Sequence, residues 1–265
     1  MVGVNLFMVA VGPRVGTAKR GKARSMTTKL EAKIKSQVAD VDLIQRRRGQ
    51  IVTAAVELFS QQGFYLTTMQ DVARKAGVSI GLIYQYVHDK DDVLLLALLS
   101  VLESYKREIP AALAGVTDPL ARCWIAVDAY CRVVDARRDA TVLAYRSTKS
   151  LPKPRREIIQ NAEIETNEFI AACLRECVRQ GLFRDVDIDL ATYHFVTFAH
   201  SWALKYWRMR ELCTLDRYIE QGLDLLLTAL LTPKGRRHYQ KMLADRKNGV
   251  APWPAPASRR EPKSA

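Results

Sequence analysis

Hydrophobic residues recur at helical spacing along most of the chain, and strand-like alternation of apolar and polar residues is absent from Asp89 onward. Residues 46–88 hold three short helical patterns, and a longer, strongly apolar pattern follows them. Glycine and proline stand between the periodic segments rather than inside them. The pattern therefore predicts an all-α protein with a small N-terminal three-helix unit and a larger helical domain.

The first two short helices carry recognisable start and stop signals. The first is predicted to begin after the run Arg46–Arg48 and to end at Gly63, because glycine adopts the left-handed C-terminal conformation without strain. Thr68 is a good N-cap for the second helix. Asp71, three residues later, completes an approximate capping box, with Asp in place of the usual Glu or Gln.

A short turn, Ala-Gly-Val at residues 76–78, separates the second helix from the third. Ser79 is a good N-cap for the third helix, which is predicted over residues 80–87. Two short helices joined by such a turn are typical of a helix-turn-helix, whose second helix normally enters the major groove of DNA. Ile83 and Val87 are four residues apart and are predicted to face the core, so that the rest of this helix faces DNA.

The third helix and its surroundings offer groups suited to both parts of DNA. Phosphates select hydroxyls, cations and helix N-termini, whereas base edges select amides and small apolar groups. Gln85 is suited to an adenine, and Ile80 and Leu82 are suited to thymine methyl groups. For Tyr84 and Tyr86 the alternative is packing on neighbouring helices. The predicted DNA contacts are Arg47, Arg48, Thr67, Thr68, Ser79, Ile80, Gly81, Leu82, Tyr84, Gln85, Tyr86 and Lys90.

At this point the residues resemble a known family. Residues 67–95, TTMQDVARKAGVSIGLIYQYVHDKDDVLL, resemble the DNA-binding domain of the tetracycline-repressor (TetR) family in their caps, turn, tyrosines and lysine. The resemblance implies that the early residues of the third helix read bases. The positions that it assigns to phosphates are Thr68, Tyr84, Tyr86 and Lys90. Ile80 and Leu82 depart from the polar residues that many members carry there, so DNA shape is expected to supply much of the specificity.

Beyond the helix-turn-helix, the periodicity predicts six helices, near 89–108, 118–136, 138–150, 154–181, 187–208 and 215–232. The predicted breaks are Pro110, Gly115, Pro119, Pro152, Pro154, Gly181 and Pro233. We expect a basic N-terminal extension (1–44), a helix-turn-helix DNA-binding domain (45–92), a helical ligand-binding and dimerisation domain (93–233) and a basic C-terminal tail (234–265).

The last two predicted helices suggest a dimer. The segment 187–208 is apolar on more than one side and must be covered on more than one side, and Gly222 in the segment 215–232 allows close approach. A two-fold dimer would cover these faces and would place two reading helices roughly 34 Å apart, on successive major grooves. The resemblance agrees, since family members dimerise through their last two long helices; the alternative is a core helix in a monomer. The predicted interface residues are Phe195, Ile219, Leu223, Leu226 and Leu230.

The larger domain also carries aromatic side chains with a few polar groups, which is typical of a small-molecule site. The predicted ligand residues are Tyr145, Arg146, Tyr193, His200, Trp202, Tyr206 and Trp207. Two alternatives stay open. Arg146 is as well suited to a salt bridge with Glu163 or Glu165, and Trp202 and Trp207 are suited to packing in the core or at the dimer interface.

A second resemblance concerns the ligand. The segments 144–152 (AYRSTKSLP) and 181–191 (GLFRDVDIDLA), with the acidic helix 157–176 between them, resemble a subgroup found beside fatty-acid, sterol and other acyl-CoA degradation functions. The resemblance implies an acyl-CoA or related lipid metabolite as effector, with Arg146 meeting an anionic group.

Charge is unevenly distributed along the 265 residues. The net charge of +13 divides into +8 for residues 1–50, −2 for residues 51–233 and +7 for residues 234–265. Basic ends raise non-specific DNA affinity and make it salt-sensitive, while the alternative is that they are solvated tails.

Several other classes of protein are disfavoured. The five cysteines (Cys123, Cys131, Cys173, Cys177 and Cys213) are odd in number and scattered, which favours buried free thiols over a disulfide framework, and over a metal held by the pair one helical turn apart. No nucleophile elbow, phosphate-binding loop or H-E-x-x-H pair occurs, so we expect no enzyme activity, no metal and no cofactor.

The cell compartment is also predicted from the sequence. The longest apolar runs, such as Val93–Leu99, are too short to span a bilayer. The apolar residues 1–11 precede the basic residues, the reverse of a secretory signal. We therefore expect a cytoplasmic, nucleoid-associated bacterial protein with no membrane partner.

Together these features predict a dimeric, ligand-responsive regulator that represses transcription by binding a palindromic double-stranded DNA operator and is released by a small molecule. The alternative is an architectural DNA-binding protein without a ligand. The near-neutral second domain with its aromatic walls argues against that alternative.

Overall fold

The computed structural model describes residues 34, 38 and 40–248. Apart from one isolated antiparallel bridge between Phe183 and Leu231, these residues form helices and their connections, which confirms the all-α prediction. The α-helices are α2 (Val41–Gln62), α3 (Met69–Ala76), α4 (Ile80–Tyr86), α5 (Lys90–Ala112), α6 (Pro119–Ala136), α7 (Arg138–Ser147), α8 (Lys153–Arg179), α9 (Ile188–Leu204), α10 (Tyr206–Leu212), α11 (Leu215–Thr228) and α12 (Pro233–Lys247). A short 3-10 helix, η1 (Thr148–Ser150), lies between α7 and α8.

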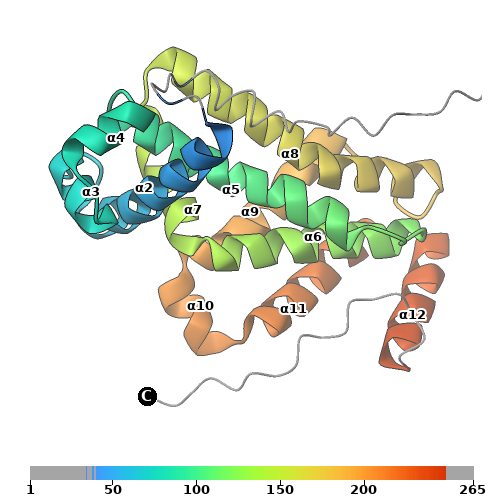
Figure 1. Ribbon diagram of the computed structural model, residues 1–265. Helices are drawn as coiled ribbons and strands as arrows, with labels where there is room; N and C mark the ends of the chain where they lie inside the picture. Colours follow the sequence, from blue (N-terminus) through green and yellow to red (C-terminus); the bar gives the residue numbers. More distant parts are fainter. Residues whose placement is uncertain (1–33, 35–37, 39, 249–265) are drawn as a thin grey trace, which may run out of the picture.

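The helices form two groups that share α5. Helices α2, α3 and α4, which we call the reader, lie at one end of the molecule, and α12 lies at the opposite end (Figure 1). Helix α5 packs on α2 in the reader and on α6, α7 and α8 in the larger domain. Helix α5 is therefore a packing link between the larger domain and the reader.

Most predicted joints are confirmed, and their chemistry is local. Gly115 and Gly181 have positive φ angles of 77° and 69°, which only glycine adopts without strain. Asp118 caps α6 by accepting a bond from the Ala121 amide at 2.7 Å, with Pro119 at the first helical position.

Four boundaries differ from the prediction. Helix α2 begins at Val41, ahead of the three arginines, because the Asp40 side chain caps it. Pro110 does not break α5, which continues to Ala112; the proline has no N–H to bond to the carbonyl oxygen four residues before it, and the helix ends two residues later. The predicted helix 187–208 divides at Lys205 into α9 and α10. Residues 233–247 of the expected tail form α12, capped by Thr232, while residues 249–265 lie outside the described residues.

The apolar stripe of α11 faces inward. Phe195, Ile219 and Leu223 are at most 2 % exposed, and Leu230 is also buried, so a single chain already covers four of the five side chains predicted for the dimer interface. Leu226 is half-buried. We therefore correct the prediction that this stripe forms the dimer interface, because it packs α11 on the rest of its own chain.

Helices α9 and α11 pack closely because Gly222 has no side chain. A Cβ atom at this position would overlap the Phe198 ring, which also stacks on Tyr218 with ring centroids 4.7 Å apart. The predicted role of Gly222 in close helix approach is confirmed, although both helices belong to the same chain.

Two further findings concern side-chain chemistry and helix length. All five cysteines are free thiols; four are buried and Cys213 is half-buried. None of the described helices combines the length and the apolar character that a membrane span requires.

Candidate DNA-binding surface and ligand cavity

The helices of the reader are fixed by the predicted caps. The Thr68 hydroxyl accepts a bond from the Asp71 amide at 3.1 Å, and the Asp71 carboxylate accepts one from the Thr68 amide at 3.0 Å, which confirms the capping box. Gly77 ends α3 with a φ of 67°, and the Ser79 hydroxyl accepts a bond from the Leu82 amide at 3.2 Å. Both caps leave the N-terminal ends of α3 and α4 at the surface, where helix dipoles favour phosphate.

The outward face of α4 is narrower than the sequence predicted. Tyr84 is 46 % exposed, and Gly81 and Gln85 are also exposed. Tyr86 is 3 % exposed and packs with the core, as the alternative for this residue held. The structure therefore favours the packing alternative for Tyr86 over the predicted phosphate contact.

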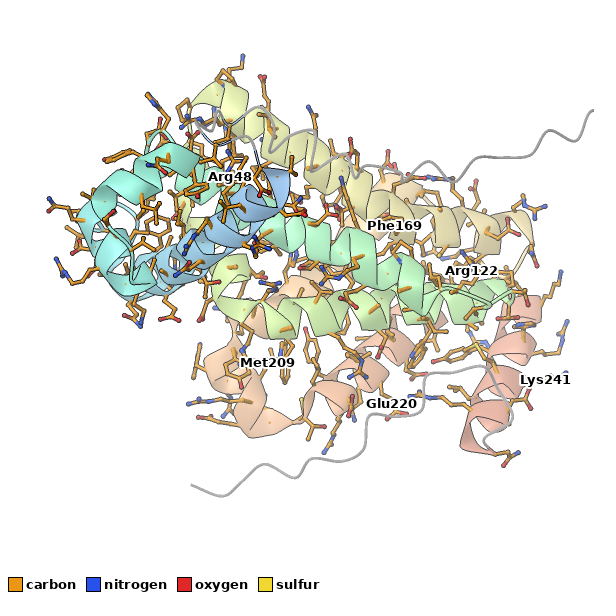
Figure 2. All side chains as sticks on the ribbon, viewed as in Figure 1. Arg48, Arg122, Phe169, Met209, Glu220 and Lys241 are labelled. Carbon is orange, nitrogen blue, oxygen red and sulfur yellow. The ribbon has the colours of Figure 1, made fainter. Side chains whose placement is uncertain are left out.

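Arg48 also points inward. Its guanidinium donates to the Tyr86 carbonyl oxygen at 3.0 Å and to the Ile34 carbonyl oxygen at 2.7 Å, and the residue is 7 % exposed. It lies among the helices of the reader (Figure 2). The predicted DNA contact of Arg48 is corrected to a bond that fixes the end of α4 against α2.

Lys90 and Thr67 hold the loop that precedes α3. The Lys90 ammonium donates to the carbonyl oxygens of Phe64, Tyr65 and Thr67 at 2.8, 3.2 and 2.9 Å, and lies 4.6 Å from the centre of the Phe64 ring. An ammonium has three donors, so none remains for a phosphate. The Thr67 hydroxyl donates to the Gly63 carbonyl oxygen at 2.8 Å and is buried. Both residues therefore position the loop instead of facing DNA.

The remaining predicted DNA residues do reach the surface. Arg47 is half-buried beside Gln50, with 3.0 Å between its Nη1 and Gln50 Oε1, and Ile80 and Leu82 are half-buried on the core. The fully exposed members of the predicted set are Thr68, Ser79, Gly81, Tyr84 and Gln85.

A cavity of about 260 Å³ lies in the larger domain between α5 and α8. We call it the ligand cavity. Its lining residues are Leu98, Val101, Leu102, Tyr105, Tyr130, Thr141, Ala144, Tyr145, Thr148, Ile159, Gln160, Glu163 and His200. Tyr145 and Gln160 are exposed, so the cavity opens to solvent beside them.

His200 sits at the centre of a polar chain in this wall. Its Nε2 lies 3.2 Å from the Tyr130 hydroxyl and its Nδ1 lies 2.9 Å from the Tyr145 hydroxyl. Burial lowers the pKa of His200 to about 4, so the ring is neutral near pH 7. The Tyr130 hydroxyl donates to Asn167 Oδ1 at 3.5 Å and therefore accepts from Nε2–H, which leaves Nδ1 to accept from Tyr145.

Glu163 is the acidic member of the wall. Burial raises its pKa, and no hydrogen bond or ion pair reaches its carboxylate from the described residues. Its charge lies near enough to Tyr145 to add to the effect of burial, and both raise the pKa of that tyrosine. Among the described residues no lysine or arginine lines the cavity.

Two of the seven predicted ligand residues, Tyr145 and His200, line this cavity. Trp202 does not, because it is buried elsewhere with its Nε1 donating to Asp135 Oδ1 at 2.7 Å, which is the packing alternative. The Tyr206 ring lies under the guanidinium of Arg138, whose central carbon is 4.1 Å from the centre of the ring. The other three, Arg146, Tyr193 and Trp207, are exposed side chains outside the cavity.

The salt bridge considered for Arg146 is also absent from the described residues, because Glu165 pairs with Lys106 at 2.8 Å and Glu163 has no partner. Sequence reasoning missed the tyrosines at 105 and 130 and the α8 residues of the wall. The helical spacing of Ile159 and Glu163 indicates one common face of α8, but not that this face borders a cavity.

One arginine joins the cavity wall to the reader. Arg155, in the first turn of α8, donates to both oxygens of Asp89 at 2.9 and 3.0 Å and lies 2.7 Å from Asp92 Oδ1. Asp89 caps α5 by accepting from the Asp92 amide at 2.7 Å, three residues after α4 ends. Ile159, one turn after Arg155 on α8, lines the cavity. Arg155 therefore links α8, one turn before a residue that lines the cavity, to the segment that follows the reading helix.

Comparison with known proteins agrees with this arrangement. Residues 51–97 match the family model described as bacterial regulatory proteins, tetR family, and residues 116–207 match that of the tetracyclin repressor-like C-terminal domain. The chain is 50% identical over 209 residues to the HTH-type transcriptional regulator HbdR of Aromatoleum sp. (strain CIB), covering 79% of this chain and 91% of the relative.

Two further relatives extend the comparison. The HTH-type transcriptional repressor KstR2 of Rhodococcus jostii (strain RHA1) is 28% identical over 192 residues, covering 71% of this chain and 92% of the relative. The crystal structure of the TetR family regulator PfmR from Thermus thermophilus superposes with a TM-score of 0.61 at 25% identity, covering 67% of this chain and 97% of that one. The chain belongs to the TetR family and is a ligand-responsive, DNA-binding transcriptional regulator.

Proposed function

We propose that the protein is a dimeric repressor that binds a palindromic operator through α4 of each copy and is released when the acyl group of an acyl-CoA enters the ligand cavity. The observation that carries the proposal is the position of the cavity. Its walls include α5 and α7, which both pack on α2 of the reader, and α8, whose Arg155 bonds to Asp89 at the start of α5. The relative KstR2 is named as a transcriptional repressor, which favours repression here.

The size of the cavity favours a small acyl group over a whole thioester. Small-molecule sites usually enclose about 300–1,000 Å³, and this cavity of about 260 Å³ falls below that range. A coenzyme A moiety would therefore remain outside, at the mouth beside Tyr145 and Gln160.

Three basic residues lie close in sequence to residues of the cavity wall near that mouth. Arg146 and Lys149 stand next to the lining residues Tyr145 and Thr148, and Arg156 lies one helical turn before Gln160. We call these three residues the rim. None of them forms an ion pair with a described residue, so their charges are available for the phosphates of coenzyme A.

A ligand changes operator affinity only if it binds one arrangement of the protein more tightly than another. An acyl group between α5 and α8 favours arrangements in which these helices lie farther apart. Arg155 on α8 holds Asp89 and Asp92 at the start of α5, so such a change alters the tilt of the reader. Two readers in a dimer would then lose the spacing that a palindrome requires.

The outward faces of α9 and α11 are suited to the dimer contact. Leu190 and Tyr193 on α9 are 64% and 47% exposed, and Leu225 on α11 is 72% exposed. Exposed apolar side chains on the two helices that the family uses for dimerisation favour a two-fold contact there. Sedimentation of Tyr193→Glu and Leu225→Glu variants tests this surface, and a variant that remains a dimer would exclude its position from the contact.

A mobility-shift titration on the DNA upstream of the protein's own gene tests the whole proposal, with a panel of acyl-CoA thioesters and their free acids. Release by a thioester, but not by coenzyme A alone, is expected. The Arg156→Ala variant should need several-fold more of that thioester, whereas Arg175→Ala on the exposed side of α8 should match the wild type. Tight binding that no thioester affects would remove the acyl-CoA effector and leave DNA binding in place.

A further inference from the structure

The inner wall of the ligand cavity holds one carboxylate and, among the described residues, no cationic side chain. Glu163 lines the cavity from α8, and the remaining polar lining groups are neutral hydroxyl, amide and imidazole groups. We propose that the enclosed acyl group is uncharged and carries a hydrogen-bond donor, a hydroxyl or an amino group, which Glu163 selects. This inference rests on the acyl-CoA effector proposed above.

An acyl group with a second carboxylate is disfavoured by the wall. A ligand carboxylate would lose its hydration, meet the like charge of Glu163, and find no lysine or arginine among the lining residues. The same argument disfavours a free acid that enters carboxylate first. The rim cations lie outside, so they hold anionic groups at the mouth only.

An acyl group without any polar substituent is disfavoured for a different reason. It would cover Glu163 and remove water from a carboxylate that has no partner among the described residues. When a buried acceptor loses water without gaining a donor, the free-energy cost exceeds the gain from the new apolar contact. Sites built to pair with a polar substituent reject analogues that lack it for this reason.

Three other polar groups of the wall pair with one another or with Asn167, while the hydroxyls of Tyr105 and Thr141 are buried without a partner among the described residues and can each donate as well as accept. Tyr145 donates to His200 Nδ1, His200 Nε2–H donates to Tyr130, and Tyr130 donates to Asn167. The donors of this chain are used within it, so none of them is paired with Glu163. Among the lining groups that lack a partner in the described residues, Glu163 is the only one that can carry a charge, so its carboxylate is the strongest acceptor for a ligand donor.

The apolar part of the wall is suited to a ring or a short chain. Tyr105 and Tyr130 stack with ring centroids 4.1 Å apart, and Leu98, Leu102 and Ile159 complete the surface. An apolar protein cavity of about 150 Å³ accepts benzene. The larger cavity seen here leaves room for one six-membered ring with a substituent.

Matched thioesters test the inference. We would titrate the full-length protein with four coenzyme A thioesters of one six-membered-ring acid, which carry a hydrogen, a methoxy, a hydroxyl or a carboxylate at the same ring position, with each position taken in turn. Calorimetry measures binding and mobility shift measures DNA release. The hydroxylated thioester should bind about tenfold more tightly than the hydrogen and methoxy forms, and the carboxylated form should not bind.

The Glu163→Gln variant provides the second arm, because a glutamine both donates and accepts. In this variant the hydroxylated thioester should lose most of its advantage and the methoxy form should gain affinity. Glu157→Gln, at an exposed position of α8, is the matched control and should keep the wild-type order of affinities.

The outcomes separate the two proposals. Equal affinity for all four thioesters, or the same order of affinities in Glu163→Gln as in the wild type, would overturn the role of Glu163 and leave the acyl-CoA effector in place. Failure of every thioester to bind and to release DNA would overturn the effector itself, and the inference with it. Tightest binding of the carboxylated form would reverse the electrostatic argument.

Discussion

Replacing Arg155 by glutamine removes the ion-pair cluster that ties α8 to the start of α5. The guanidinium holds both oxygens of Asp89 at 2.9 and 3.0 Å and one oxygen of Asp92 at 2.7 Å. Burial opposes ionisation of Asp89, yet the bonds from Arg155 and from the Asp92 amide keep its pKa below the usual value. Without Arg155, the carboxylates of Asp89, Asp91 and Asp92 remain close together, and Lys90, which acts on Asp91, is the cation left beside them.

The burial of the partners sets the size of the effect. The Asp92 side chain is 6% exposed, that of Arg155 is 24% exposed and that of Asp89 is 43% exposed. Exposed pairs contribute about 0–1 kcal/mol, whereas removing one partner of a buried pair costs about 3–5 kcal/mol. A cluster between these limits should cost about 2 kcal/mol, which lowers Tm by about 4–8 °C for a chain of this size.

Thermal unfolding and amide exchange measure this prediction. The amide protons of His88 and Asp92 bond to the Asp92 and Asp89 carboxylates, so both should exchange faster in Arg155→Gln. The pKa of Asp89 is lower in the folded protein than in the unfolded chain. The extra stability of the wild type over Arg155→Gln is therefore present above the unfolded-state pKa and is lost as the pH falls through the folded-state pKa. The Tm difference should therefore shrink in acid.

Lys153→Gln is the control for the loss of a cation from the same turn of α8. Lys153 lies 3.9 Å from Glu157, and both side chains are more than half exposed, so its loss should cost less than about 0.5 kcal/mol. If Arg155→Gln and Lys153→Gln have the same Tm and the same exchange at His88, the cluster does not hold the reader, and the proposed route from α8 to α4 is refuted.

Three further predictions follow from single contacts. Lys90→Ala should weaken operator binding because it loosens the loop before α3. The slope of the logarithm of the DNA-binding constant against the logarithm of the salt concentration should stay unchanged. A slope smaller by about 0.9 would show a lost phosphate contact instead. Burial lowers the pKa of His200 to about 4, against an ordinary imidazole pKa of 6.5. The free energy of unfolding should therefore fall by about 3 kcal/mol as the pH drops from 6.5 to 4. Thermal unfolding of His200→Asn should lack this part of the pH dependence. Gly222→Ala should cost about 2 kcal/mol in denaturant unfolding because Phe198 must move. Its control, Gly49→Ala at an open position of α2, should stabilise by up to about 1 kcal/mol, and equal effects would contradict the packing argument.

The parts of the reader that sequence predicts correctly are those fixed by neighbours in the chain. Thr68 pairs with Asp71 three residues away, and Gly77 is needed for a positive φ whatever the rest of the protein does. The orientation of Tyr86 is different in kind. Its ring lies in the core because α4 packs on α2, from which Arg48, 38 residues earlier, bonds to the Tyr86 carbonyl oxygen. Spacing within α4 alone does not contain that information.

The ligand cavity shows the same division. The sequence indicates an aromatic-rich helix near 187–208. His200 and Trp202 stand two residues apart on it, yet His200 lines the cavity and Trp202 is buried outside it. His200 faces the cavity because Tyr130 and Tyr145 arrive from two other helices. Trp202 is held away because Asp135 accepts its indole N–H. Such pairings between distant segments decide the site, and periodicity cannot supply them.

The internal bonds of the reader also limit how a ligand can control it. Arg48 ties α2 to the end of α4, and Lys90 ties the start of α5 to the loop before α3, each through main-chain carbonyl oxygens. These bonds hold the reader as a rigid body, so a ligand need not rearrange any residue that faces DNA. A cavity of about 260 Å³ is then large enough for control. In the proposed mechanism, a small displacement of α8 would change the tilt of α5, and the distance between the two readers of a dimer would enlarge that tilt into a mismatch with the operator.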